Sequence, residues 1–127
     1  MKSTIFPTLT ETIELQKELI KRFGGEKGVR DMGLLESALS RPQSGYYESL
    51  SLQAAALMQS LALNHSFIDG NKRVAFALTA IFLRMNGYKL IVSPKEGEHF
   101  LIHEIIINKV SLETIAKWLE NHMKKAT

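Results

Sequence analysis

The sequence predicts a single all-α domain of about six helices, because apolar residues recur at helical spacing along most of the chain. The chain has 127 residues, and 45% of them are hydrophobic. This length and composition suffice for one compact core but not for two. Capping residues and glycines bracket the apolar stretches, as they do in folded helices. The expected domain spans residues 1–127, and no repeat or linker divides it.

The first two helices are recognisable by their ends. Thr8 and Glu11 have the spacing of a capping box, in which each side chain bonds the backbone of the other residue. Apolar residues follow at helical intervals until Gly24-Gly25 stops the run. A second, short helix is expected over Met32–Leu39, because Pro42 pushes the residue before it out of helical geometry.

Two loops flank this short helix. Arg30 and Asp31 precede it, and either could touch a substrate, although Asp31 has the residue type and the position of a helix cap. Residues 43–50 follow it and have the glycine, serine and tyrosine content of an exposed loop or a small hairpin.

Two apolar helices should form the centre of the domain. Ser51 is expected to cap a helix that runs to Asn64. The next helix is expected over Val74–Asn86, and it is nearly all apolar as far as Leu83, which makes it the most enclosed helix. Gly87 is a suitable C-terminal stop for it.

The C-terminal third should contain two more helices. Residues 88–92 alternate weakly and predict a short strand or an extended link. The segment Ser93–Glu96 combines a cap, a first-turn proline and a third-position glutamate, which together start a helix. Ser111 should cap the last helix, and Lys124-Lys125 suits its negative end.

Composition excludes several classes of protein. The formal net charge is +3, but the basic residues are scattered in local pairs, so no direct nucleic-acid partner is predicted. The longest uncharged run, residues 49–68, is too polar to span a bilayer, and no membrane partner is predicted. The chain has no cysteine, and residues 1–7 lack the apolar core of a signal peptide. A reducing, cytoplasmic location is therefore expected.

Residues 65–73 read HSFIDGNKR and concentrate polar chemistry between the two apolar helices. Asp69-Gly70-Asn71 falls where the second of these helices should begin, so its free backbone N–H groups and positive dipole end would face a bound anion. Gly70 allows the backbone to approach a phosphate closely. The adjacent cations Lys72 and Arg73 suit a polyphosphate.

Three further residues of this stretch have candidate roles. Asp69 could hold a magnesium ion, which prefers oxygen ligands and shares them with substrate phosphates. His65 could take a proton from an attacking hydroxyl, and Phe67 should anchor the loop in the core. Taken singly, Asp69 could be only a helix cap and His65 only structural, and the two cations could be a solvated face. Their order and compactness together favour a catalytic phosphate site.

This stretch resembles the signature of the Fic/Doc family, histidine-x-phenylalanine-x-acid-glycine-asparagine, which continues in the Doc branch with lysine-arginine. Residues 30–43 and 82–88 are also similar to Doc-like proteins. The resemblance implies a Fic/Doc-type helical domain with a short flap or hairpin, to which residues 43–50 would correspond. The flap of Fic-like proteins helps to dock the target protein, a role in which Tyr46 and Tyr47 would share.

Two departures from the Fic pattern favour the Doc branch. Fic enzymes generally transfer AMP from ATP to a hydroxyl of a target protein, and they have a glycine at the position of Lys72 and a second arginine at that of Phe76. Doc-type toxins transfer the γ-phosphate instead, and their known target is a threonine of elongation factor Tu, whose modification arrests translation. The resemblance thus implies a protein kinase that uses ATP and Mg²⁺. Its implied site residues are His65 as general base, Asp69 as magnesium ligand, and Gly70, Asn71, Lys72 and Arg73 on phosphate oxygens.

Two other functions remain open from the sequence. The chain could be a Fic-type adenylyltransferase, or a non-catalytic binding domain that has kept the scaffold. A non-catalytic domain has no need of four such residues together, namely His65, Asp69, Asn71 and Arg73. Regulated Fic proteins often carry an inhibitory glutamate that pairs with the second arginine. That arginine is absent here, so the resemblance implies restraint by a separate antitoxin of the Phd type.

Overall fold

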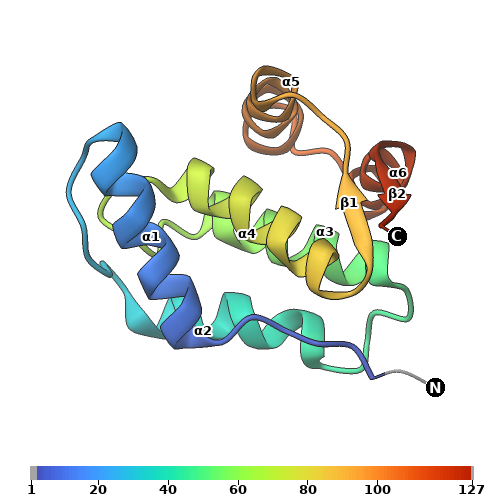
Figure 1. The fold of residues 1–127 in the computed structure, drawn as a ribbon, viewed down its shortest axis with the longest axis horizontal. Helices are drawn as coiled ribbons and strands as arrows, with labels where there is room; N and C mark the ends of the chain where they lie inside the picture. The colour runs from blue at the N-terminus through green and yellow to red at the C-terminus, as the bar shows by residue number, and fades with distance from the viewer. Residues whose placement is uncertain (1–2, 127) are drawn as a thin grey trace.

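The computed structural model describes residues 3–126, which form six α-helices and a small two-stranded sheet (Figure 1). The predicted all-α class is confirmed. The α-helices are α1 (Leu9–Phe23), α2 (Met32–Ser40), α3 (Leu50–Leu63), α4 (Asn71–Met85), α5 (Pro94–His99) and α6 (Leu112–His122). The other elements are the 3-10 turn η1 (Arg41–Gln43), the π-helix η2 (Phe100–Ile107) and the strands β1 (Tyr88–Leu90) and β2 (Met123–Lys125). Among these helices there is none with both the length and the apolarity to cross a membrane.

Side-chain caps start most helices at the predicted positions. Thr8 and Glu11 form the capping box of α1, and the serines predicted for α5 and α6 cap those helices. Helix α3 differs, because Ser49 rather than Ser51 caps it. Ser51 is buried in the first turn, where its hydroxyl donates to Glu120 Oε2 at 2.6 Å and links α3 to α6.

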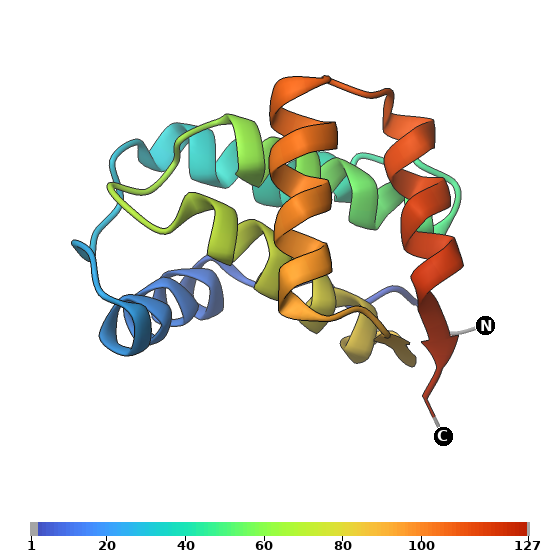
Figure 2. The same ribbon diagram turned by 90° about the horizontal axis from the view of Figure 1, so that it is seen from above.

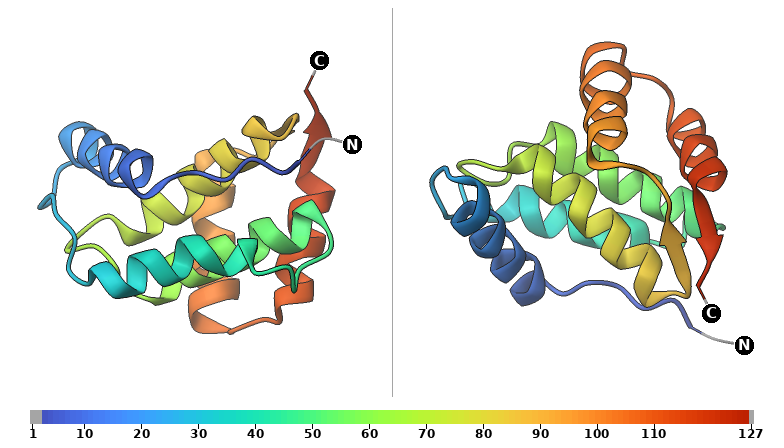
Figure 3. Two further views of the ribbon diagram at one scale, coloured as in Figure 1. Left: turned by 90° about the horizontal axis from the view of Figure 1, so that it is seen from below. Right: turned by 45° about the horizontal axis from the view of Figure 1, so that its top comes forward.

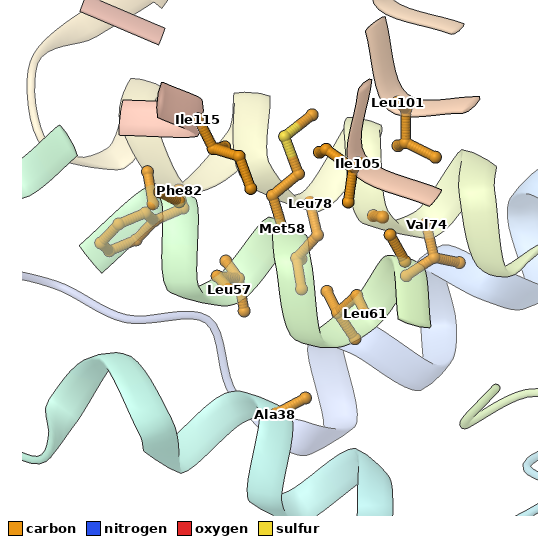
Figure 4. Packing of buried hydrophobic residues seen from close by; sticks show 14 of the residues in the cluster. Ala38, Leu57, Met58, Leu61, Val74, Leu78, Phe82, Leu101, Ile105 and Ile115 are labelled. Atoms are coloured by element: carbon orange, nitrogen blue, oxygen red, sulfur yellow. The ribbon is translucent and has the colours of Figure 1, made fainter. Parts of the chain in front are cut away.

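The core lies around the central pair of helices, α3 and α4, which run side by side. Helix α1 packs against α4 and α2 against α3, while α6 and η2 cover the rest of the pair (Figures 1, 2 and 3). Figure 4 shows how side chains from these helices meet in the interior. Among the buried residues drawn there are Leu57, Met58 and Leu61 of α3, Val74, Leu78 and Phe82 of α4, Leu101 and Ile105 of η2, and Ile115 of α6.

The last described residues form a strand rather than the end of α6. Strand β2 pairs antiparallel with β1, and the N–H of Ile91 donates to the carbonyl of His122 at 2.6 Å beside it. The expectation that Lys124-Lys125 lies at the negative end of the last helix is therefore wrong. Pairing with β1 satisfies backbone groups that would otherwise need further helix or water.

The helix predicted from Ser93 also differs in its second half, where α5 continues into a π-helix. The N–H of Asn108 donates to the carbonyl of His103, five residues back, at 3.0 Å. In this widened segment Phe100 stacks on Trp118 of α6, with ring centroids 4.1 Å apart. The stack joins the two C-terminal helices, which lie next to each other in Figure 2.

Residues 43–50 form no hairpin and lie far from the motif. They complete η1 and lead as a loop into the start of α3, whereas His65 follows the end of α3. A helix of 14 residues is roughly 21 Å long, so this loop and the motif lie at opposite ends of α3. The Tyr47 hydroxyl accepts a hydrogen bond from Arg41 Nε at 2.8 Å, and Tyr46 is 81% exposed. Of the two forms predicted for residues 43–50, the exposed loop is therefore confirmed and the hairpin is wrong, while residues 24–31 contact the motif.

Replacing Gly97 with alanine should destabilise the domain, because a β-carbon there would lie 2.6 Å from Cζ of Phe76 in α4. Overpacking of this kind costs about 1–3 kcal/mol of unfolding free energy, which urea denaturation can measure. Gly33→Ala in α2 is the matched control, since its β-carbon would meet nothing nearer than 3.4 Å. Equal stability of the two variants would contradict the contact between Gly97 and Phe76.

Candidate phosphate-binding and catalytic site

The motif loop joins α3 to α4 and contains two residues with left-handed backbone conformations. His65, directly after the C-cap of α3, has a φ of 52°, and Gly70, the N-cap of α4, has a φ of 77°. Glycine adopts this conformation freely, whereas for histidine it costs roughly 1–2 kcal/mol. His65 is exposed, so solvent and a substrate hydroxyl can reach it. The strain is therefore located at the residue predicted to be the general base.

Asn71 uses both polar atoms of its side chain inside the loop. Its Oδ1 accepts from the N–H of Phe67 and its Nδ2 donates to the carbonyl of Phe67, both at 2.9 Å. Phe67 is 1% exposed and belongs to the core, where the sequence places it as an anchor. The Asn71 amide thus closes the loop onto this anchor. The backbone N–H of Asn71 remains free for an anion, and the role of Asn71 as a phosphate ligand stays a prediction.

The start of α4 is free to bind an anion. Gly70 offers no side chain, and the first backbone bond of the helix is from the N–H of Val74 to the carbonyl of Gly70. The three preceding N–H groups, those of residues 71–73, therefore have no partner within the helix. Such groups, aligned with the positive end of the helix dipole, bind phosphate oxygens well.

Asp69 does not cap α4 but is fastened to the loop after α1. Its Oδ2 accepts from the N–H of Glu26 at 2.8 Å. Within residues 3–126 no three or more histidine or acidic side chains gather into a metal site. Asp69 could still hold a magnesium ion as a single protein carboxylate, because Mg²⁺ is commonly bound through one or two carboxylates together with substrate phosphates. The exposed carboxylate fits that ion.

Gln16, on the inner face of α1, supports the motif although the sequence pattern does not mark it as a site residue. Only 1% of it is exposed, and its Nε2 donates to the carbonyls of Asp69 and Glu26 at 3.1 and 3.3 Å. Its Oε1 accepts from the N–H of Gly28 at 3.2 Å. One buried amide therefore ties α1, the following loop and the motif together. A signal was present, because Gln16 lies at helical spacing between Ile13 and Ile20 on an otherwise apolar stripe.

Residues 28–31 run beside the motif loop and form backbone hydrogen bonds with it. Val29 and Phe67 form an antiparallel bridge, and the N–H of Ile68 donates to the carbonyl of Gly28 at 3.1 Å. The N–H groups of residues 30 and 31 both donate to the carbonyl of Ser66, at 2.8 and 3.0 Å. The loop is therefore held from outside as well as by Asn71.

The two cations of the motif are exposed beside the start of α4. The guanidinium of Arg73 lies over the ring of Phe23, at the end of α1, with 4.7 Å between its Cζ and the ring centroid. This contact keeps the side chain near the helix start. Lys72 is exposed and forms no salt bridge with another described residue. Both positive charges can therefore add to the field that the α4 N-terminus creates.

Phe76, to which the resemblance assigns the position of the second arginine of Fic enzymes, packs against α5. Its ring lies against Gly97 of α5, where a glycine alone leaves enough room. The position is half-buried between α4 and α5 and carries no charge. It therefore supplies no ligand for phosphates.

Comparison with known proteins agrees with this architecture. Residues 6–83 match the model of the Fic/DOC family, and the chain belongs to that family. Toxin Doc of Mycolicibacterium smegmatis is 43% identical over 100 residues, which cover 74% of this chain and 77% of the relative. Protein kinase doc of Escherichia phage P1 is 36% identical over 89 residues, which cover 67% and 71% of the two chains. These relatives place the chain in the Doc branch.

Asn71→Ala should destabilise the domain, because it leaves the N–H and carbonyl of Phe67 without partners. Loss of the pair should lower the free energy of unfolding by about 2 kcal/mol in urea denaturation. Asn121→Ala, at an exposed position of α6, is the control and should change it by less than about 0.5 kcal/mol. An Asn71→Ala protein as stable as the control would contradict a stabilising role of the two hydrogen bonds between the Asn71 amide and Phe67.

Ser66→Ala should leave stability unchanged or raise it by about 1 kcal/mol. The Ser66 hydroxyl is buried and has no hydrogen-bond partner among the described residues, so alanine removes only an uncompensated polar group. Ser60→Ala is the matched comparison, since the Ser60 hydroxyl accepts from Arg41 Nη1 at 2.9 Å and its loss should be destabilising. The order of the two melting temperatures tests the assignment, and a reversed order would contradict it.

Proposed function

We propose that the chain is a Doc-like toxin that transfers the γ-phosphate of ATP to a hydroxyl of a target protein. The observation that carries the proposal is the start of α4, which has no side-chain cap and carries the exposed cations Lys72 and Arg73, on the loop that begins with the exposed His65. A relative named as a protein kinase and another named as a toxin support this activity.

Phosphoryl transfer asks the protein mainly for positioning and charge stabilisation. The acceptor oxygen attacks the γ-phosphorus, and the bond between that phosphorus and the bridging oxygen of the β-phosphate breaks. ADP leaves with the electron pair of the broken bond. His65 takes the acceptor proton on a ring nitrogen as the new bond forms. The proton and the electrons are thus accounted for without a further reactant.

The triphosphate would lie across the start of α4. The backbone N–H groups at Asn71 and the two following residues bind its oxygens, and Gly70 lets them approach closely. Lys72 supplies a point charge and Arg73 a planar fork. Asp69 would hold Mg²⁺, and the ion would supply positive charge to neutralise the phosphates.

The surroundings of Phe76 favour transfer of the terminal phosphate over transfer of AMP. An arginine at this position would be needed to hold the distal phosphates in the Fic orientation. Here Phe76 stands at that position and its ring packs against Gly97. The motif has an additional cation at another position, Lys72. This change in charge distribution supports a reversed nucleotide with its γ-phosphate at the reacting centre.

The resemblance to the Doc branch supplies the biological setting of the proposal. The acceptor would be a serine or threonine, in particular a threonine of elongation factor Tu, and its phosphorylation would arrest translation in the cytoplasm. A lethal kinase requires restraint, and a Phd-like antitoxin whose tail folds on the toxin would provide it. The exposed position of His65 suits a macromolecular acceptor, because no described segment closes over it.

His65→Ala should lose at least about 100-fold of the transfer rate, because the acceptor proton then has no base. Phosphorylation of purified elongation factor Tu is followed by mass spectrometry, and growth arrest is followed on expression in cells. His103→Ala, at an exposed histidine of η2 remote in sequence from the motif, is the control and should retain activity. A folded His65→Ala protein that still transfers phosphate and arrests growth would remove the histidine from the mechanism.

A further inference from the structure

Arg30 donates hydrogen bonds to three successive carbonyl groups where the motif loop begins. Its Nε donates to the carbonyl of His65 at 2.6 Å and its Nη2 to that of Asn64 at 3.3 Å. Its backbone N–H donates to the carbonyl of Ser66 at 2.8 Å. The guanidinium is therefore engaged with the backbone of the loop, although the side chain is exposed.

These carbonyls lie where the chain leaves α3. Asn64 is the C-cap, and His65 takes a left-handed conformation at the position where glycine is the usual residue. The last carbonyls of a helix have no donor within the helix and carry the negative end of its dipole. A guanidinium offers several donors in a fixed planar fork, together with a positive charge. Arg30 thus supplies hydrogen-bond donors and a positive charge to the carbonyl groups at this helix end.

We infer that Arg30 is a positioning residue, which holds His65 in its left-handed conformation and thereby directs the imidazole. The catalytic part of this inference rests on the proposed function, in which His65 takes the acceptor proton. Arg30 touches neither phosphate nor acceptor in this role. It acts through the backbone of His65 alone.

Arg30 can hold the loop because it is itself held on both sides. Val29 before it is bridged to the buried Phe67. Asp31 after it caps α2 with its carboxylate and also donates its N–H to the carbonyl of Ser66. The guanidinium therefore projects from a segment that is fixed relative to the core. The Arg30 guanidinium can therefore bond to the carbonyl of His65 from a backbone segment that is already fixed.

Arg30→Gln should lower kcat about 10- to 100-fold, because a small displacement of a catalytic group is enough for such a loss. The KM values for ATP and for the acceptor should change by less than about twofold. Arg30→Lys should recover part of the loss, since an ammonium can donate to one carbonyl but lacks the fork. Arg84→Gln, at an exposed arginine in the last turn of α4, is the matched control. A raised KM with an unchanged kcat would show that Arg30 binds substrate, and would overturn the inference.

A second arm combines the change with the loss of the histidine. In a His65→Ala background, Arg30→Gln should cause no further loss of the residual transfer rate, because the imidazole that Arg30 positions is absent. An additional loss of about tenfold or more in that background would show a role independent of His65. That result would also overturn the inference.

A third arm needs no ATP and separates this inference from the proposed function. In a histidine-labelled protein, the coupling between the amide and α protons of His65 and its Cα shift report the backbone conformation by NMR. Arg30→Gln should move these signals away from left-handed values, while Arg84→Gln should leave them in place. Unchanged His65 signals in folded Arg30→Gln would refute the role of Arg30 as a clamp. Absence of transfer by the unaltered chain would instead refute the proposed function and leave this arm to decide.

Discussion

The pair of hydrogen bonds between the Asn71 amide and the Phe67 backbone is the constraint on which the site depends. Asn71 is the first residue of α4, and Phe67 is fixed in the core, so the pair sets the path of the chain between them. The short path makes Gly70 turn left-handed and leaves the start of α4 without a side-chain cap. The N–H groups that the proposed anion site requires are therefore left free by the way in which the loop is closed.

The closed loop also needs support from the first third of the chain. Gln16 and the backbone of residues 28–31 form hydrogen bonds with the loop, and the Arg30 side chain bonds to the carbonyl of His65. All these residues fall within the span 6–83 that matches the family model. The C-terminal helices complete the core, and the contact of Phe76 with Gly97 joins them to α4. The site is thus built by α1 to α4 and stabilised by the packing of α5, η2 and α6.

The sequence predicts well those features that depend on local chemistry. The capping box of Thr8 and the cap formed by Asp31 are each visible within a few residues. The prediction that the helix after the motif is the most enclosed is wrong, because nine residues of α3 are buried and only six of α4. Contacts between distant segments are not visible in this way, so the sequence marks Gln16 only as a polar residue on an apolar stripe and gives no sign of the bonds from Arg30 to the motif loop. Residue type alone also cannot show that the Asn71 amide bonds to the backbone of Phe67. The pairing of β2 with β1 likewise depends on tertiary contact.

The central claim is that the anion site at the start of α4 presents the terminal phosphate of ATP for transfer. Parallel reactions with ATP labelled on the α- or the γ-phosphate, with elongation factor Tu and a cytoplasmic extract as acceptors, test it most directly. The account predicts protein-bound label from the γ position alone. Label from the α position would mean transfer of AMP and would contradict the interpretation of Lys72 and Phe76. Label from neither position would contradict the assignment as a transferase.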